Sequence, residues 1–121
     1  MKLFRNKGYE LTLNRVHDTI RINENGEKLT LTVNGDPMRM VAGLNAAQKK
    51  LVELSEKEDA TPEEMRDAAE LFAAVIFGKE QTERLFDFYA GDPSCVISVC
   101  GTYFRERLAD KIAQQQKKMK I

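Results

Sequence analysis

The stretch 20–31, IRINENGEKLTL, decides the fold of the N-terminal part of the chain. Apolar residues alternate with polar ones on both sides of Asn25-Gly26, which is typical of two half-buried strands. Asn-Gly tolerates the positive φ angles of a two-residue type I′ turn, whose twist matches that of the strands it joins. If Glu24 faces Glu27 across this turn, every isoleucine and leucine of the stretch lies on one face. The turn and the alternation therefore predict the same antiparallel β-hairpin.

Two further patterns extend this β region in both directions. Tyr9, Leu11 and Leu13 alternate with polar residues and predict another strand before the hairpin, while the strand after the turn continues to Val33. The run NGDP at 34–37 ends that strand, because proline has no N–H for the ladder and Asn-Gly favours a turn. The sequence therefore predicts a three-stranded antiparallel meander, built around the hairpin, within residues 1–37.

Apolar residues at helical spacing dominate the rest of the chain. Capping residues followed by proline, and glycines after apolar stripes, divide it into four helices. We expect these from Pro37 or Met38 to Lys57, from Thr61-Pro62 to just before Gly78, from about Lys79 to Ala90, and from Asp92-Pro93 toward a flexible basic tail that starts at about 114. Strands followed by helices indicate the α+β class, in a single domain 1–121 with a β segment at 1–37 and a helical segment at 38–121.

The composition argues against several classes of partner. With 121 residues, of which 42% are hydrophobic and 31% charged, the chain suits one globular domain. Its 19 basic and 19 acidic side chains cancel, so no net positive field attracts nucleic acid. The longest apolar run, 71–77, is far shorter than the roughly 20 residues of a membrane span, and we recognise no secretory signal. We therefore expect a cytoplasmic protein with no nucleic-acid or membrane partner.

Few residues offer catalytic or metal-binding chemistry. His17 and Asp18 are neighbours, but neighbours on a strand point to opposite faces, and no serine or cysteine is placed to complete a catalytic set. Cys95 and Cys100 would point about 140° apart on a helix, which favours two small apolar residues over a disulfide or a metal site. The seven glycines form no phosphate-binding loop. We expect no enzymatic activity, cofactor or metal, with an unrecognised site at His17 and Asp18 as the alternative.

Charge is unevenly distributed along the chain. Eight acidic residues and two basic ones lie in 53–70, whereas six basic residues and two acidic ones lie in 104–121. In one interpretation, acids near helix starts and bases near a helix end complement the helix dipoles. In the other, the basic end of one copy, including Arg105, Arg107 and Lys111, meets the acidic region of the next copy. The second interpretation predicts a head-to-tail homo-oligomer.

Aromatic residues are concentrated in the helical part, where seven fall between Phe72 and Phe104. On the third predicted helix Phe86 lies roughly 160° from Phe88 and roughly 100° from Leu85, so this short helix carries apolar groups on more than one side. One small core cannot easily cover both sides. Phe86, Phe88 and Tyr89 are therefore candidates for a protein-interaction surface, with interior packing as the alternative.

A more specific pattern follows the second predicted helix. The stretch Phe77-Gly78-Lys79-Glu80-Gln81, followed by Leu85, Tyr89 and Asp92, resembles a segment common in tail assembly chaperones of siphophages and related prophages of Gram-positive bacteria. The resemblance extends loosely over 38–121, a helical body that ends in a charged helix with a lysine-rich tail. It implies a non-enzymatic assembly factor in the bacterial host cytoplasm, which binds the tape measure protein and recruits tail tube subunits.

The resemblance also implies a longer product made by programmed ribosomal frameshifting. The run 116–118, QKK, can be encoded with the slippery heptamer A-AAA-AAG, which the nucleotide sequence would test. Two other functions remain open beside the chaperone. One is a different phage structural or tail-completion protein, and the other is a non-enzymatic interaction module, such as a regulator that dimerises through the helical body.

Overall fold

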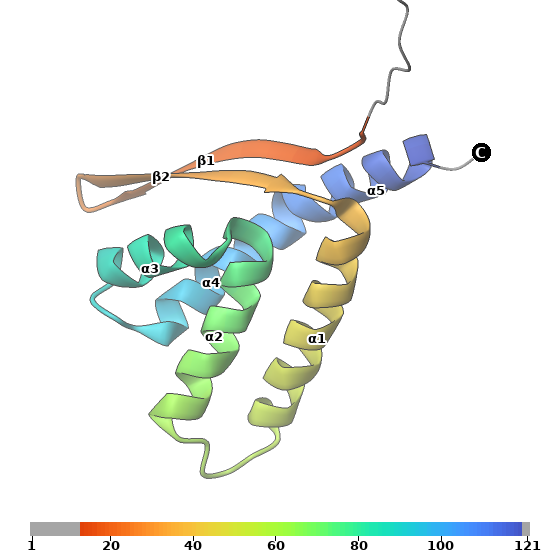
Figure 1. Cartoon of the computed structure of the whole chain (residues 1–121). Helices are drawn as coiled ribbons and strands as arrows, with labels where there is room; N and C mark the ends of the chain where they lie inside the picture. Colours follow the sequence, from red (N-terminus) through yellow and green to blue (C-terminus); the bar gives the residue numbers. More distant parts are fainter. Residues whose placement is uncertain (1–12, 120–121) are drawn as a thin grey trace, which may run out of the picture.

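A computed structural model describes residues 13–119 and contains a β-hairpin followed by helices (Figure 1). This order confirms the predicted α+β class. The predicted strand around Tyr9 and Leu11 lies outside the described residues, and Leu13 belongs to no strand. The described elements are β1 (Val16–Glu24), β2 (Glu27–Gly35), α1 (Pro37–Ser55), α2 (Pro62–Phe77), α3 (Lys79–Phe88), α4 (Pro93–Tyr103), the π-helical segment η1 (Phe104–Leu108) and α5 (Ala109–Met119).

The hairpin has the predicted register. Glu24 pairs with Glu27, and the two turn residues Asn25 and Gly26 both have positive φ, at 53° and 86°, as a type I′ turn requires. The inner face of β2 is buried at Leu29, Leu31 and Val33, while the residues between them are exposed. Burial thus follows the period of two that the sequence displays.

The hairpin lies across one end of the helical body (Figure 1). Helix α1 runs away from the hairpin and α2 runs antiparallel to it, back toward the hairpin. Helix α3 lies under β2, and the C-terminal helix passes behind α2. Gly43 permits a close approach of α1 to α2, because a Cβ atom at this position would lie 2.7 Å from Cγ2 of Val75. The core that joins the hairpin to the helices includes Leu31, Val33, Ala73, Ile76, Leu85, Val96 and Leu108.

The C-terminal helix is continuous, as predicted, but α5 extends it to Met119, past the position of about 114 where a flexible tail was expected to begin. It also contains a π-helical turn that was not predicted. Its buried residues are spaced by four or three up to Tyr103, and then by five to Leu108. In a regular α-helix a spacing of five turns a side chain about 140° away from its face. A π-helical turn accommodates the extra residue, and the Ala109 N–H accordingly bonds the Phe104 carbonyl. The π turn therefore keeps Leu108 and Ile112 on the buried face.

The start of α2 carries the predicted capping box. Thr61 Oγ1 accepts a hydrogen bond from the Glu64 N–H at 3.1 Å, and Glu64 Oε1 accepts one from the Thr61 N–H at 3.0 Å. Hydrogen bonds from the Lys57 ammonium and the Thr61 N–H lower the pKa of the Glu64 carboxyl to about 2. Because Lys57 follows α1 and Glu64 lies in the first turn of α2, their ion pair also holds together the two ends of the loop between these helices.

Removal of this cap should weaken the protein measurably. Thr61→Ala leaves the Glu64 N–H without its acceptor, and we expect the free energy of unfolding to fall by about 1 kcal/mol in urea denaturation. Thr61→Ser keeps the hydroxyl and should stay within about 0.5 kcal/mol of the original protein. Equal losses in the two variants would show that the hydroxyl contributes nothing.

Candidate protein-interaction surfaces

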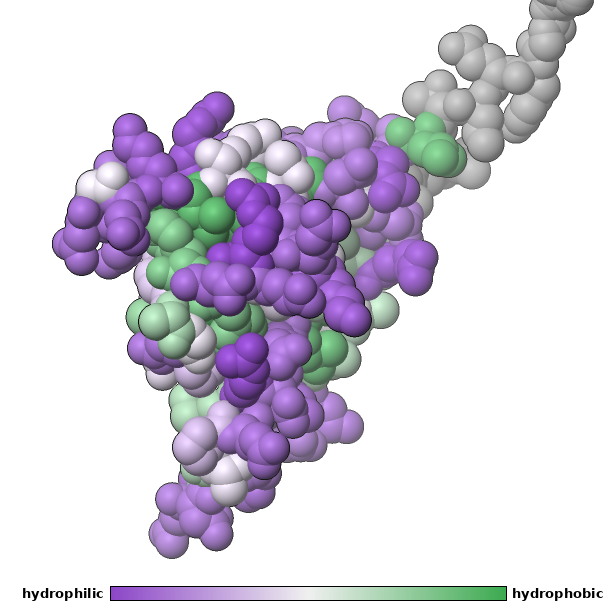
Figure 2. Space-filling view, turned by 60° about the vertical axis from the view of Figure 1, so that its left-hand side comes forward, coloured by the Kyte–Doolittle hydropathy of each residue, from purple (hydrophilic) through white to green (hydrophobic). Residues whose placement is uncertain are grey.

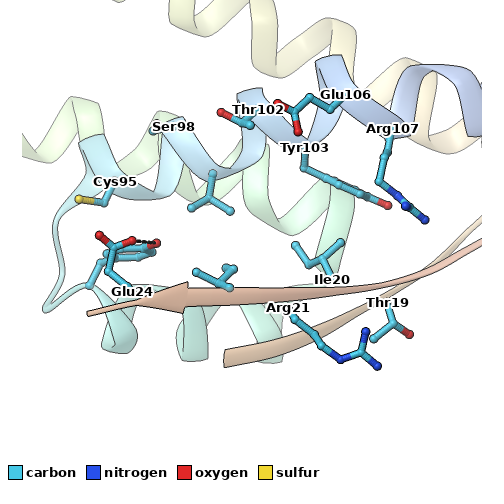
Figure 3. A pocket seen from close by; sticks show the side chains of 13 residues that line it. Thr19, Ile20, Arg21, Glu24, Cys95, Ser98, Thr102, Tyr103, Glu106 and Arg107 are labelled. Atoms are coloured by element: carbon cyan, nitrogen blue, oxygen red, sulfur yellow. Dashed lines mark hydrogen bonds between the residues drawn. The ribbon is translucent and has the colours of Figure 1, made fainter. Parts of the chain in front are cut away.

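A groove of about 600 Å³ lies between β1 and the helix formed by α4 and η1 (Figure 3). Its apolar lining comes from Ile20 and Ile22 of β1, which are only half-buried, and from Val99 of α4. Charged side chains, among them Glu24 and Arg107, surround it. Figure 2 shows hydrophobic side chains reaching the surface below the hairpin, framed by hydrophilic ones. We call the groove between β1 and the helix of α4 and η1 the hairpin groove.

Asp18 joins β1 to the C-terminal helix at one end of the hairpin groove. Its Oδ2 accepts hydrogen bonds from the Tyr103 hydroxyl at 2.8 Å and from Arg107 Nε at 2.9 Å, and its Oδ1 accepts one from Arg107 Nη2 at 2.8 Å. The carboxylate side chain is only 7% exposed. Burial alone would raise the pKa of Asp18, but the hydrogen bonds from Arg107, Tyr103 and the Thr19 N–H outweigh it and hold the pKa below its ordinary value.

The same geometry separates Asp18 from His17. His17 is exposed and lies on the opposite face of β1, and the Asp18 carboxylate is engaged by Tyr103, Arg107 and Thr19 instead. The structure therefore does not assemble a His17–Asp18 pair. Within residues 13–119 no three His, Cys, Asp or Glu side chains lie close enough together to hold a metal ion.

Tyr89 lies at the other end of the hairpin groove. Its hydroxyl donates a long hydrogen bond of 3.4 Å to Glu24 Oε2, and burial followed by the nearby Glu24 carboxylate raises its pKa. The Tyr89 ring packs edge to face against Phe88, with 5.0 Å between ring centroids. Both rings are half-buried, so each leaves part of its surface for a partner.

The expectation that Phe86 belongs to an exposed surface is wrong. Its side chain is only 3% exposed and belongs to the main core. The Arg66 guanidinium of α2 lies 4.4 Å from the ring centroid and covers the ring, a favourable cation–π arrangement. Thus α3 buries Leu85 and Phe86 together, because neighbouring elements cover both sides of this short helix.

The three basic residues singled out from the sequence have different environments. Arg107 is bound to Asp18, and Lys111 is close enough to contribute to the low pKa of that carboxyl. Arg105 is exposed and reaches over Gly101, on another side of the helix. The structure therefore places Arg107 and Lys111 near the hairpin and Arg105 beside a second depression.

This second depression, of about 250 Å³, lies between α1, α2 and the C-terminal helix. It is lined by half-buried apolar side chains of all three, namely Leu44, Leu51, Phe72 and Phe104, with Arg105 at its border. We call it the helical cleft. Its residues were predicted only as core positions, because the sequence does not show that their burial stays incomplete.

The two charged regions lie at opposite ends of the molecule (Figure 1). The acidic residues cluster around the loop between α1 and α2, whereas the basic ones lie along η1 and α5. Among residues 13–119, two ion pairs neutralise part of this acidic charge, Lys57 with Glu64 and Arg66 with Glu70. This separation is the geometry that head-to-tail contacts between copies need.

The cysteines are both free. Cys100 is buried in the core, as predicted, and burial raises the pKa of its thiol to about 12. Cys95 is half-buried and lines the hairpin groove, where its thiol lies 3.4 Å from Asp92 Oδ2. Cys100 is thus an inert core residue.

Comparison with protein-family models, with curated proteins and with solved structures finds no match for this chain. Among the helices of residues 13–119, none is long and apolar enough to cross a membrane.

Proposed function

We propose that this protein is a non-enzymatic phage tail assembly chaperone, which binds the tape measure protein and recruits tail tube subunits in the host cytoplasm. The stretch that resembles such chaperones lies at the two joints around α3. Gly78 links α2 to α3 with a φ of 84°. Leu85 is the fully buried residue of α3, and the Asp92 side chain caps the start of α4. Each of these residues thus has a specific structural task at one of the two joints.

The helical cleft is the observation that carries the proposal. Tape measure proteins are long helical clients, and an amphipathic helix binds by laying its apolar face into a groove of this kind. Leu51, Phe72 and Phe104 supply half-exposed apolar anchors, and Arg105 supplies a charge at the border. A chaperone needs weak, repeatable contacts of this kind and no catalytic group.

Self-association would let several copies coat one long client. The acidic loop between α1 and α2 and the basic helix η1–α5 face opposite ends of the molecule, so one copy can present its basic end to the acidic end of the next. Such heterologous contacts build rings or open helical arrays. The proposal therefore includes a homo-oligomer joined by these two ends.

Co-expression with the tape measure protein of the same genome tests the proposal. We expect the original chain to keep the tape measure protein soluble and to elute with it in size-exclusion chromatography. Leu51→Lys places an ammonium group in the helical cleft and should reduce the co-eluting tape measure protein at least about tenfold.

Val52→Lys is the matched control. Val52 is the next residue of α1, is 49% exposed and does not line the helical cleft, so this variant should bind as the original chain does. Absence of a complex with the original chain would contradict the proposal. Binding to another tail protein instead would favour the alternative of a structural or tail-completion protein.

A further inference from the structure

Arg105 brings a positive charge without a counter-ion to the border of the helical cleft. Its side chain is exposed and takes part in none of the ion pairs formed among residues 13–119. The residues that line the cleft include no acidic side chain, and the polar groups opposite Arg105 are the neutral amides of Asn45 and Gln48 on α1. The cleft therefore offers a cation to a partner that brings a carboxylate.

The Arg105 guanidinium lies over Gly101, which is one turn earlier in the same helix. A Cβ atom at Gly101 would lie 3.3 Å from Arg105 Nη1, and no other described side chain comes within 4 Å of that point. Gly101 thus differs from Gly43, where a Cβ atom would collide with Val75. Glycine weakens a helix relative to alanine, and the packing of the described chain does not require it at Gly101. The missing side chain instead leaves the backbone of α4 open to close approach by a partner.

The shape of the helical cleft suits one face of a further helix. Helices α1 and α4 both pack on α2, and the cleft lies between them, with Phe72 of α2 in its lining. Leu44 and Leu51 lie about two turns apart on one face of α1. On the opposite wall the π turn begins at Phe104, and π turns within α-helices occur frequently at functional sites. A volume of about 250 Å³ admits apolar side chains of a helix but not its backbone.

We propose that the helical cleft selects an acidic amphipathic helix of the client, whose apolar side chains enter the cleft beside Gly101 and whose carboxylate pairs with Arg105. Residues three or four positions apart share one face of a helix, so a carboxylate one turn from an inserted apolar side chain reaches the guanidinium. The ion pair fixes the position of the client helix along the cleft and disfavours basic helices. This inference rests on the proposed function, because it names the kind of client segment that the cleft selects.

Two model peptides of about 20 residues, long enough to form helices, test the proposal. Both have the same apolar face of leucine and alanine, which is flanked by glutamate in the acidic peptide and by lysine in the basic peptide. We expect the full chain to bind the acidic peptide at least about tenfold more tightly, as measured by fluorescence polarisation. Arg105→Glu should reverse this preference. Lys117→Glu makes the same charge change at an exposed position of α5 outside the cleft, and this matched control should keep it.

Gly101→Leu tests the close approach to α4 separately. Leucine fills the open space and also favours the helix, so affinity for the acidic peptide should fall at least about tenfold while the thermal midpoint does not fall. Ala113→Leu adds bulk at an exposed position of α5 and should bind the acidic peptide as the original chain does. Unchanged affinity in Gly101→Leu would show that no partner approaches this position and would overturn the proposal.

Other results with Arg105 would also overturn the proposal. These are equal affinity of the original chain for the two peptides, binding of neither peptide, and a preference for the acidic peptide that survives Arg105→Glu. Loss of self-association in Arg105→Glu with an unchanged preference would assign the cleft to a second copy. A chain that co-elutes with the tape measure protein but shows no preference contradicts this inference alone. A chain that prefers the acidic peptide but binds no tape measure protein contradicts the chaperone function alone.

Discussion

Replacement of Leu31 by alanine should lower the free energy of unfolding by about 3 kcal/mol, the largest effect that we expect from a single substitution. Leu31 is 0% exposed and is the centre of the apolar face of β2. Alanine would leave a cavity between the hairpin and the helices, since the closely packed neighbours can relax only in part. Thermal unfolding should shift down by about 10 °C for a chain of this size.

The control for this change is Leu71→Ala in α2. Leu71 is 36% exposed, so the same chemical deletion there should cost less than about 1 kcal/mol. We also expect a single cooperative transition in far-UV circular dichroism, because the inner face of the hairpin shares one core with α2, α3 and α4. A hairpin that melts before the helices, or equal losses in the two variants, would contradict this account of the core.

Local patterns predicted the hairpin and the helix starts correctly because their causes are local. The Asn25-Gly26 turn fixes the strand register, and Thr61 with Glu64 fixes the start of α2 through bonds that span three residues. The π-helical turn could not be predicted in this way, because Cys100, Phe104, Leu108 and Ile112 follow one another at a regular spacing of four. Only the burial of Tyr103 in place of Phe104 shows the extra residue in the turn.

The interaction surfaces could not be predicted, because they depend on contacts between distant residues. Asp18 meets Tyr103 and Arg107 some 85 residues later, and Gln81 closes the edge of β2 from 49 residues away. Phe86 was misplaced for the same reason, since the sequence does not show that Arg66 covers its ring. Periodicity tells which face of an element is apolar, but not which neighbour covers it or how completely.

The second large effect concerns Asp18. Asp18→Asn removes the negative charge that receives the hydrogen bonds of Tyr103 and Arg107, and we expect the free energy of unfolding at pH 7 to fall by about 2 kcal/mol. Amide groups can still accept one of these bonds, but not the charge-assisted pair from the guanidinium. Asp110→Asn is the control, since the Asp110 side chain is exposed and forms no ion pair with another described residue. That variant should stay within about 0.5 kcal/mol of the original protein.

The effect of Asp18→Asn should depend on pH in a defined direction. The pKa of Asp18 in the folded protein lies below its ordinary value of 3.8, so the folded state binds the proton less readily than the unfolded state. The stabilisation is therefore fully present above about pH 5 and is lost as the pH falls through 3.8 toward the folded pKa. Urea denaturation at pH 7 and near pH 3 should show the difference between the original chain and Asp18→Asn becoming smaller at the lower pH. Other carboxyl groups, such as Glu64, titrate in both chains and cancel in this comparison. A difference that stays constant with pH would mean that Asp18 stabilises the fold through its shape and not through its charge.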